Sequence, residues 1–351
     1  MFAALAVLAF VADPADPADW QQQESRYLKN VRQVTSDYVR AGEGYFSPDG
    51  TKIIFQAEEK GTGNPFYQIF VQDLATGRAV RVSPGVGKTT CAYFRPDGQK
   101  IIFASSHLDP AAKSHYAPEY RQREEDQKAG TRRRYTWDFD EHMDIFEANL
   151  DGTGLKRLTD AKGYDAEGSY SADGKFIVFA SERDRRPDQK DRNVELYIMN
   201  ADGSHVRKLT NAPNCYNGGP FFSPDGKRVV FRSDRKEKDR LQLYVINADG
   251  TGERALTDKP TWVCWGPYWH PDGKHIVYAG ADHGTGGRPN YDLYWMNVDS
   301  GKEKETRLTY APGADVLPVF SPDGKRLMWT STRDGRSPSQ LYISDFMPPE
   351  D

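Results

Sequence analysis

Unbroken apolar runs alternate with short polar turns along most of the chain, and this pattern predicts β-strands. The clearest unit runs from Phe221 to Thr257, where FFSPDGKRVVF is followed by a polar loop, LQLYVINADG and a short final segment. Pro presets φ at the second position of a type I turn, Asp caps the turn with its side chain, and Gly takes the left-handed position. Because such turns join antiparallel strands, the unit is a meander of four short strands.

The same unit recurs six times along the sequence. The Asp of the first turn marks each copy: Asp49, Asp97, Asp173, Asp225, Asp272 and Asp323. By subtraction, neighbouring copies lie 47–52 residues apart, except for one interval of 76 that contains an insert. Blades of a β-propeller repeat every ~40–50 residues. The apolar run after each turn is continuous, which indicates strands buried on both faces, so neighbouring sheets must stack on one another.

The two ends of the chain each hold part of one blade. Five copies have a fourth strand that ends in a hydroxyl residue: Ser83, Thr159, Thr210, Thr257 and Thr309. The last copy stops after its third strand, and residues 31–35 (VRQVT) match the fourth-strand sequence at 206–210 (VRKLT). We therefore predict an all-β, six-bladed propeller of four-stranded antiparallel blades, closed by pairing the N-terminal strand into the last blade.

The repeated motif SPDGK…VVF…LYVINADGTG…LT resembles the WD40-like repeat of TolB-type β-propellers. The resemblance covers residues 31–346 in six copies. It implies the propeller fold and a binding or protein-interaction role in the cell envelope. The α/β domain that precedes the propeller in TolB itself is expected to be absent, because only residues 1–30 precede the first strand. Propellers also host several enzyme classes, so the fold alone does not decide the function.

Charge and length limit the classes of partner. Lys and Arg number 47 against 51 Asp and Glu, a net charge of −4, and the single basic run, 132–134, lies among acidic residues. A nucleic-acid partner would need a concentrated basic face, so none is expected. At 351 residues we predict one propeller domain over 31–351, acting as a monomer, with an envelope protein, a peptide or a glycan as partner.

The N-terminal residues predict export. Residues 1–12 (MFAALAVLAFVA) are apolar but too few to span a membrane, so an integral membrane protein is not expected. With a small-residue cleavage site at 7–9, they resemble a secretory signal, although the positively charged start is missing. Residues 13–19 then form a spacer. A periplasmic or secreted protein is predicted, and the alternative is a buried or frayed N-terminal tail.

Strand order predicts two unlike faces of the ring. The SPDG and NADG turns lie on one face, whereas the longer and more varied loops lie on the other, where binding function usually resides. The longest loop is the insert 107–144 in the second blade, and its residues 118–128 (PEYRQREEDQK) favour a short, charged helix. The insert either caps the channel mouth or is a solvated decoration.

Polar residues that enter the first strands are expected to converge on the central channel of the loop-rich face. Counting six and four places back from the first residue of each turn gives these polar residues: Glu43, Thr89, Cys91, Asp165, Glu167, Asn217 and Asp315. Carboxylates that share one mouth can hold a divalent cation, bind a cationic group or raise one another's pKa for acid–base work. The competing interpretation is hydrogen bonding to backbone amides at strand starts. As a group these residues are the candidate ligand-binding site, and no catalytic residue is assigned.

Histidines extend this candidate site. His107 and His283 lie in loops of the same face, and imidazoles can ligate a metal or act as a base. Because their spacing is not that of metal ligands, surface or hydrogen-bonding roles are favoured. No cofactor is predicted, and a divalent cation is left open. The cysteines at 91, 215 and 264 are expected to be free, partly buried thiols, with a bridge between the last two as the alternative.

Two other sets repeat between blades and are expected to be architectural. Arg183, Arg235 and Arg333 occupy one equivalent position, which favours a contact to a neighbouring carboxylate. A polar residue precedes every third strand: Gln68, Asp144, Glu195, Gln242, Asp292 and Gln340.

Three functions are compatible with this sequence. A non-catalytic binding module ranks first, a metal-assisted carbohydrate lyase or hydrolase second, and a propeller detached from a serine oligopeptidase third. Neither G-x-S-x-G nor H-E-x-x-H occurs, and the GVGKTT segment at 85–90 leads into a strand, not into the helix that a phosphate-binding loop requires.

Overall fold

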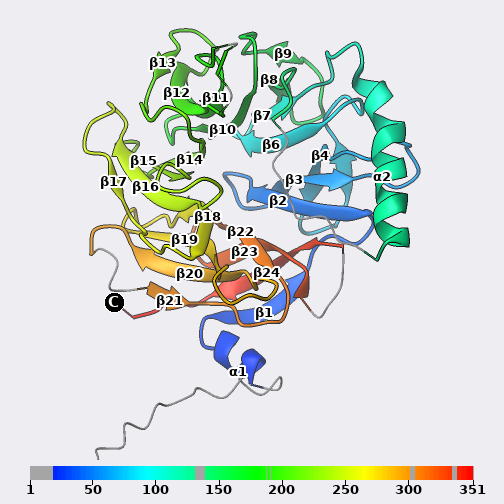
Figure 1. Cartoon of the computed structure of the whole chain (residues 1–351). Helices are drawn as coiled ribbons and strands as arrows, with labels where there is room; N and C mark the ends of the chain where they lie inside the picture. The colour runs from blue at the N-terminus through cyan, green and yellow to red at the C-terminus, as the bar shows by residue number, and fades with distance from the viewer. Residues whose placement is uncertain are drawn as a thin grey trace, which may run out of the picture.

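Six four-stranded antiparallel sheets follow one another around a ring (Figure 1). The computed structural model describes residues 19–130, 139–186, 188–189, 191–300, 305–333 and 338–350. The predicted six-bladed propeller is confirmed. The signal-like segment, most of the spacer and the basic run at 132–134 lie outside the described residues.

Each blade has its strands in one order from the channel outward. The inner strands are β2 (Arg40–Phe46), β6 (Thr89–Phe94), β10 (Asp165–Tyr170), β14 (Asn217–Phe222), β18 (Trp262–Trp269) and β22 (Asp315–Phe320). The second strands are β3 (Lys52–Glu58), β7 (Lys100–Ser105), β11 (Phe176–Ser181), β15 (Arg228–Ser233), β19 (His275–Asp282) and β23 (Arg326–Ser331). The third strands are β4 (Gln68–Asp73), β8 (Asp144–Asn149), β12 (Glu195–Asn200), β16 (Gln242–Asn247), β20 (Asp292–Asn297) and β24 (Gln340–Phe346). The outer strands are β5 (Ala79–Arg81), β9 (Lys156–Arg157), β13 (Arg207–Lys208), β17 (Arg254–Ala255), β21 (Glu305–Arg307) and β1 (Leu28–Gln33).

The turns between inner and second strands are held by their own side chains. In the first blade, Ser47 Oγ donates to Asp49 Oδ1 at 2.5 Å, and the same oxygen accepts from Thr51 N at 3.0 Å. These hydrogen bonds stabilise the ionised carboxyl and lower the pKa of Asp49 to about 2. The turn face is therefore short and rigid, and the second strands that follow it are buried on both sides, as Ile53 and Ile54 are.

One hydroxyl joins the third and fourth strands of every blade. It accepts a hydrogen bond from a third-strand amide at 2.8–2.9 Å, and the six pairs are Ser83–Ile69, Thr159–Ile145, Thr210–Leu196, Thr257–Leu243, Thr309–Leu293 and Thr35–Leu341. The sixth hydroxyl follows β1, which pairs with β24 from Leu28–Phe346 to Gln33–Tyr342. The N-terminal strand β1 is thus the fourth strand of the last blade, and Thr35 supplies the hydroxyl that the other blades have at the end of their own fourth strands.

Substituting this sixth hydroxyl tests the contribution of the N-terminal strand. Thr35→Val leaves the buried Leu341 amide without its acceptor, so we expect a loss of about 1–3 kcal/mol in the free energy of unfolding, measured in urea. Thr309→Val, the equivalent change inside the chain, should lose a similar amount, whereas the exposed Ser36→Ala should be neutral. A Thr35→Val protein as stable as Ser36→Ala would contradict this role.

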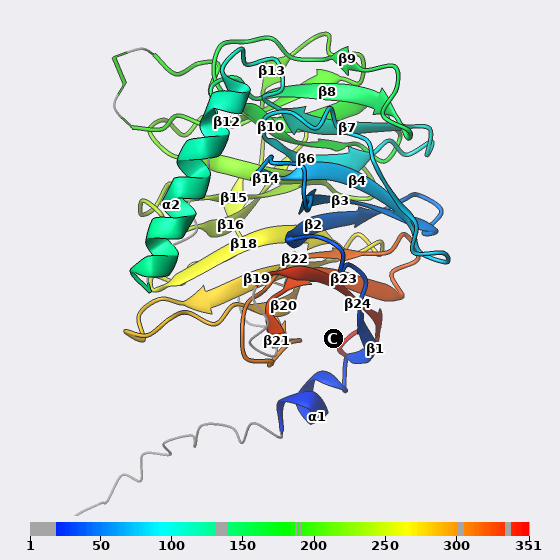
Figure 2. The same ribbon diagram turned by 90° about the vertical axis from the view of Figure 1, so that its right-hand side faces the viewer.

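The insert forms a short 3₁₀ turn, η1 (Ala112–His115), and the helix α2 (Tyr116–Lys128), which begins two residues before the predicted span. Arg123 fastens the helix to the first blade, where Nη1 contacts Glu58 Oε1 at 2.7 Å and Nη2 donates to the Pro65 carbonyl at 2.7 Å. Figure 2 shows α2 standing beside the stacked blades. The other helix, α1 (Trp20–Glu24), precedes β1. Within the described ranges, neither helix has the length and apolar character that crossing a membrane requires.

Candidate functional site

Every inner strand has a bulge at the same place, and the bulged residue faces the channel. The residues with positive φ are Glu43, Cys91, Glu167, Gly219, Gly266 and Leu317, with φ between 45° and 60°. The strand register shifts at each of these points, and all six residues line one central cavity of about 30 Å³. A bulge re-aims a side chain, and a non-glycine residue adopts positive φ only where its surroundings impose it. The fold therefore directs the candidate residues at 43, 91 and 167 inward.

Glu167 is the most strongly bonded of these residues. Arg232 Nη2 contacts its Oε2 at 2.8 Å, and both side chains are almost fully buried. Tyr216 Oη donates to the same oxygen at 2.7 Å, Tyr164 Oη donates to Oε1 at 3.0 Å, and the Gly219 amide donates to Oε2 at 2.6 Å. A buried charge is tolerated only when it is paired and hydrogen-bonded, and Glu167 meets both conditions.

The fourth blade is built to admit this arginine. A Cβ on Gly218 would overlap the Tyr216 hydroxyl, and a Cβ on Gly219 would lie 2.6 Å from Arg232 Nη1. Two adjacent glycines thus clear the space that the guanidinium and the phenol occupy. The residues at the corresponding register position in the other blades are small or neutral: Gln56, Ala104, Ala180, Ala279 and Thr330. Our sequence interpretation missed Arg232, although this single basic residue and the Gly-Gly pair were visible signals.

Glu43 lies in the same cavity with weaker contacts. Tyr45 Oη donates to its Oε1 at 3.3 Å, and Cys91 Sγ donates to its Oε2 at 3.8 Å. Burial raises the pKa of Glu43 to about 7; the Arg232 charge opposes this rise and the Glu167 charge adds to it. Burial also raises the pKa of the Cys91 thiol well above its usual range, which makes it a poor nucleophile.

Aromatic side chains close the channel between this cavity and the turn face. Tyr45, Tyr93, Phe221 and Tyr268 pack with ring centroids 5.0–6.1 Å apart, and the hydroxyls of Tyr93 and Tyr268 lie 3.0 Å from each other. Beyond them, a second cavity of about 250 Å³ is lined by aromatic residues and by the turn prolines, among them Pro48, Pro96, Pro224, Pro271 and Pro322. The two cavities are therefore chemically unlike, one charged and one apolar.

Three other predicted residues are engaged inside their own blades and do not line the central cavity. The pairs are Asp165 with Arg183 at 3.0 Å, Asn217 with Arg235 at 2.6 Å, and Asp315 with Arg333 at 2.9 Å. The predicted contact of the repeated arginines is confirmed at the two aspartates, and in the fourth blade an amide replaces the carboxylate. The structure thus separates the candidate set into channel residues and residues that brace strand ends.

The predicted histidines lie outside the central cavity. His107 Nδ1 is 3.0 Å from Ser105 Oγ, and its ring packs on Phe146. Burial and the nearby Arg157 charge lower the pKa of His107. His283 Nε2 is 2.8 Å from the Tyr291 hydroxyl. Across the described ranges, no group of three or more His, Cys, Asp or Glu side chains is arranged to hold a metal ion, and the three cysteines are free and buried.

The end of the insert folds over the channel residues. The ring of Phe139 meets the rings of Tyr164 and Tyr216 edge-on, at 5.3 and 5.6 Å, and these are the two phenols that hold Glu167. Arg192, from the third blade, lies over the ring of Phe139 with its Cζ 4.1 Å from the ring centroid. This part of the insert therefore reaches from its own blade to the third and fourth blades.

Comparison with known proteins agrees with this architecture. Residues 187–287 and 250–348 match the family model of the TolB beta propeller domain. The chain is a TolB-like β-propeller. This TolB-like propeller is similar in structure to a protein of Agrobacterium tumefaciens assigned as a TolB, with a TM-score of 0.60, 19% identity, and coverage of 91% of this chain and 94% of that one.

Two further similarities are to a lyase and to a peptidase. The oligogalacturonate lyase of Vibrio parahaemolyticus has a TM-score of 0.55 at 14% identity, covering 90% of the TolB-like chain and 93% of the lyase, which shows a shared fold. The uncharacterized peptidase YuxL of Bacillus subtilis is 29% identical over 208 residues, which are 57% of this chain and 27% of YuxL. The TolB-like chain therefore matches less than a third of the length of that curated relative.

Proposed function

We propose that this TolB-like propeller is a non-catalytic binding module of the cell envelope that holds a protein or peptide partner on its loop-rich face. The observation that carries the proposal is that the buried charges of Arg232 and Glu167 in the channel pair with each other. Glu167 receives four donors, and the surrounding cavity of about 30 Å³ is far below the ~300–1,000 Å³ of small-molecule sites.

The loop-rich face has the chemistry of a protein interface. Half-buried aromatic rings lie there beside cationic side chains, as Phe139 does beside Arg192 and Trp262 beside Lys259 at 4.3 Å. Aromatic residues and arginine are enriched at interfaces because they offer large contact areas and planar donors. Export to the periplasm is part of the proposal and rests on the signal-like residues 1–12.

A second candidate is the substrate-selecting propeller of a peptidase, which the similarity to YuxL favours. In that case the loop-rich face would meet a catalytic domain. The loop-rich face would still be the binding surface, and peptides would be the substrate class. A lyase activity is supported only by the shared fold and ranks third.

Turnover assays separate the enzyme from the binding module. The purified protein is incubated with oligogalacturonate and Mn²⁺, and in parallel with a mixture of unstructured peptides. We expect neither unsaturated sugar product nor peptide fragments above a boiled-protein control. Sugar product that disappears in His107→Ala and His283→Ala proteins would replace the binding proposal with the lyase.

A further inference from the structure

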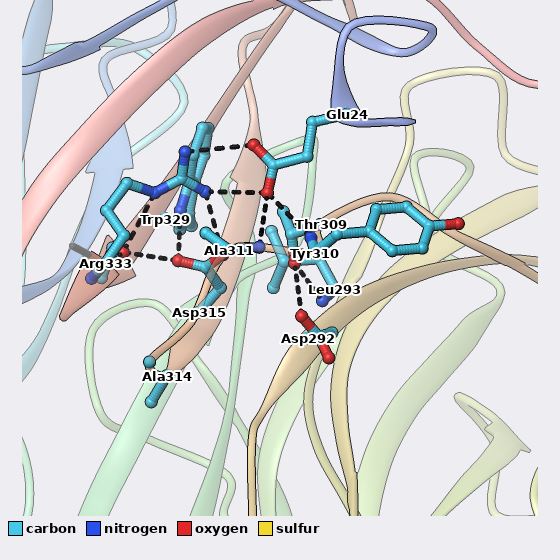
Figure 3. Close-up of polar contacts among 12 residues, drawn as sticks. Glu24, Asp292, Leu293, Thr309, Tyr310, Ala311, Ala314, Asp315, Trp329 and Arg333 are labelled. Carbon is cyan, nitrogen blue, oxygen red and sulfur yellow. Dashed lines mark hydrogen bonds and ion pairs between the residues drawn. The ribbon is translucent and has the colours of Figure 1, made fainter. Parts of the chain in front are cut away.

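A buried carboxylate fastens the N-terminal helix to the propeller. Glu24 is the only buried residue of α1, and it is 3% exposed. Its Oε1 accepts from the amides of Tyr310 at 2.8 Å and Ala311 at 3.0 Å, and Arg333 donates to both oxygens at 3.2 and 3.4 Å (Figure 3). Two consecutive amides and a guanidinium therefore converge on one carboxylate.

The fifth blade has a short side chain at a position where three other blades have a longer one. In three other blades the first residue of the third strand accepts from the equivalent amide: Gln68 from Gly85 at 2.9 Å, Glu195 from Ala212 at 2.8 Å, and Gln242 from Lys259 at 3.0 Å. In the fifth blade this residue is Asp292, which is shorter and accepts from Arg307 at 2.7 Å. The second blade has the same arrangement, in which Asp144 accepts from Arg157 at 2.6 Å. The amides at 310 and 311 are thus left for a carboxylate from outside the blade.

The guanidinium that holds Glu24 also has a partner inside the propeller. Arg333 contacts Asp315 at 2.9 Å, and the equivalent Arg183–Asp165 pair of the third blade forms the same contact without Glu24. Departure of Glu24 therefore leaves no unpaired buried charge. Burial raises the pKa of Glu24, with Arg333 and the two amides opposing the rise and Asp315 adding to it, so desolvation offsets part of the attraction.

We propose that the junction of the fifth and sixth blades is a carboxylate-binding site, and that its resident Glu24 can be exchanged for a carboxylate from another molecule. The site takes one carboxylate, because Asp292 and Asp315 border it and repel a second negative charge. Its ligand is the acidic side chain or the C-terminal carboxylate of a peptide, or a small organic acid. When such a ligand takes the place of Glu24, α1 is released from the propeller. This inference does not rest on the proposed function, because Glu24, Arg333 and the amides at 310 and 311 carry it and the channel residues do not.

The test uses the full chain with Glu24→Ala and two probes. One probe is a peptide of residues 19–28 (DWQQQESRYL), and the other is succinate. We expect Glu24→Ala to lower Tm by about 2–4 °C. Adding the peptide to Glu24→Ala should restore the Tm in a saturable way. The peptide should bind the wild type at least tenfold more weakly than it binds Glu24→Ala. A peptide with alanine in place of Glu should do nothing. Recovery with succinate as well would identify the site as open to small acids, whereas recovery with the peptide alone would restrict it to peptides.

Two results would overturn the proposal. One is a Glu24→Ala protein with the Tm of Gln22→Ala, a change at an exposed position of the same helix. The other is a peptide that leaves the Tm of Glu24→Ala unchanged. If Glu24→Ala fails to fold, Glu24→Gln provides the readout: trypsin should cleave after the exposed Arg26 several-fold faster than in the wild type, and equal rates would contradict an exchangeable carboxylate.

Discussion

Replacing Arg232 by alanine is expected to lower the free energy of unfolding by about 3–5 kcal/mol, because the change leaves Glu167 as a buried charge without its counter-ion. The two side chains are 6% and 3% exposed, so the carboxylate would lose its counter-ion at a site that bulk water hardly reaches. The phenols of Tyr164 and Tyr216 would still donate to the carboxylate, but they carry no charge. Equilibrium unfolding in urea measures the loss.

Arg235→Ala is the matched control for this substitution. Arg235 is an arginine of the same blade, yet its buried partner is the neutral amide oxygen of Asn217, and its other partner, Glu253, is partly exposed. Its removal leaves no buried charge, so we expect a loss of no more than about 1.5 kcal/mol. If the two variants lost equal stability, the channel pair would not have the role that we assign to it.

Glu43→Gln is expected to stabilise the protein above pH 7 and to have little effect near pH 4.5. The folded-state pKa of about 7 lies above the ordinary value of 4.5, so folding favours the protonated carboxyl. The contribution of Glu43 is therefore complete below pH 4.5 and is lost as the pH rises through 7. Above that range, burying the charged form costs on the order of 3 kcal/mol, which glutamine avoids because it mimics the neutral acid.

The measurement is the free energy of unfolding at several pH values between 4.5 and 8.5. The charged groups that face Glu43 are Arg232 and Glu167. Because Glu43→Gln leaves both in place, a difference between the two proteins that changes with pH reports on Glu43. Glu237→Gln, at a side chain that is 61% exposed, serves as control and should give a flat difference. A wild-type profile parallel to that of Glu43→Gln would show that the carboxyl is not buried as described.

The architecture was predictable because its signals are local. Every turn after an inner strand has Asp and Gly at fixed offsets, and most also have Ser and Pro there. Each fourth strand ends in a hydroxyl, so one copy such as Phe221–Thr257 defines the others. The same counting located Glu43, Cys91 and Glu167, because the bulge that turns them inward has one position in every inner strand.

The pairing inside the site was not predictable, because its partners come from distant parts of the chain. Arg232 reaches Glu167 from another blade, 65 positions away, and Glu24 reaches Ala311 across 287 positions. Counting also treated Asp165 as a channel residue, although an arginine of its own blade holds it. Sequence periodicity assigns a residue to a face, whereas the choice of counter-ion depends on which blades become neighbours across the channel.

Site-specific photo-cross-linking tests most directly whether the loop-rich face is the working surface. The producing cell incorporates a benzophenone amino acid into the protein in place of either Tyr120, on α2, or Phe176, beside a turn of the opposite face. The two positions are matched, because their aromatic side chains are 40% and 41% exposed. We expect one discrete cross-linked partner from position 120 and none from position 176. A partner captured only from position 176 would contradict the account.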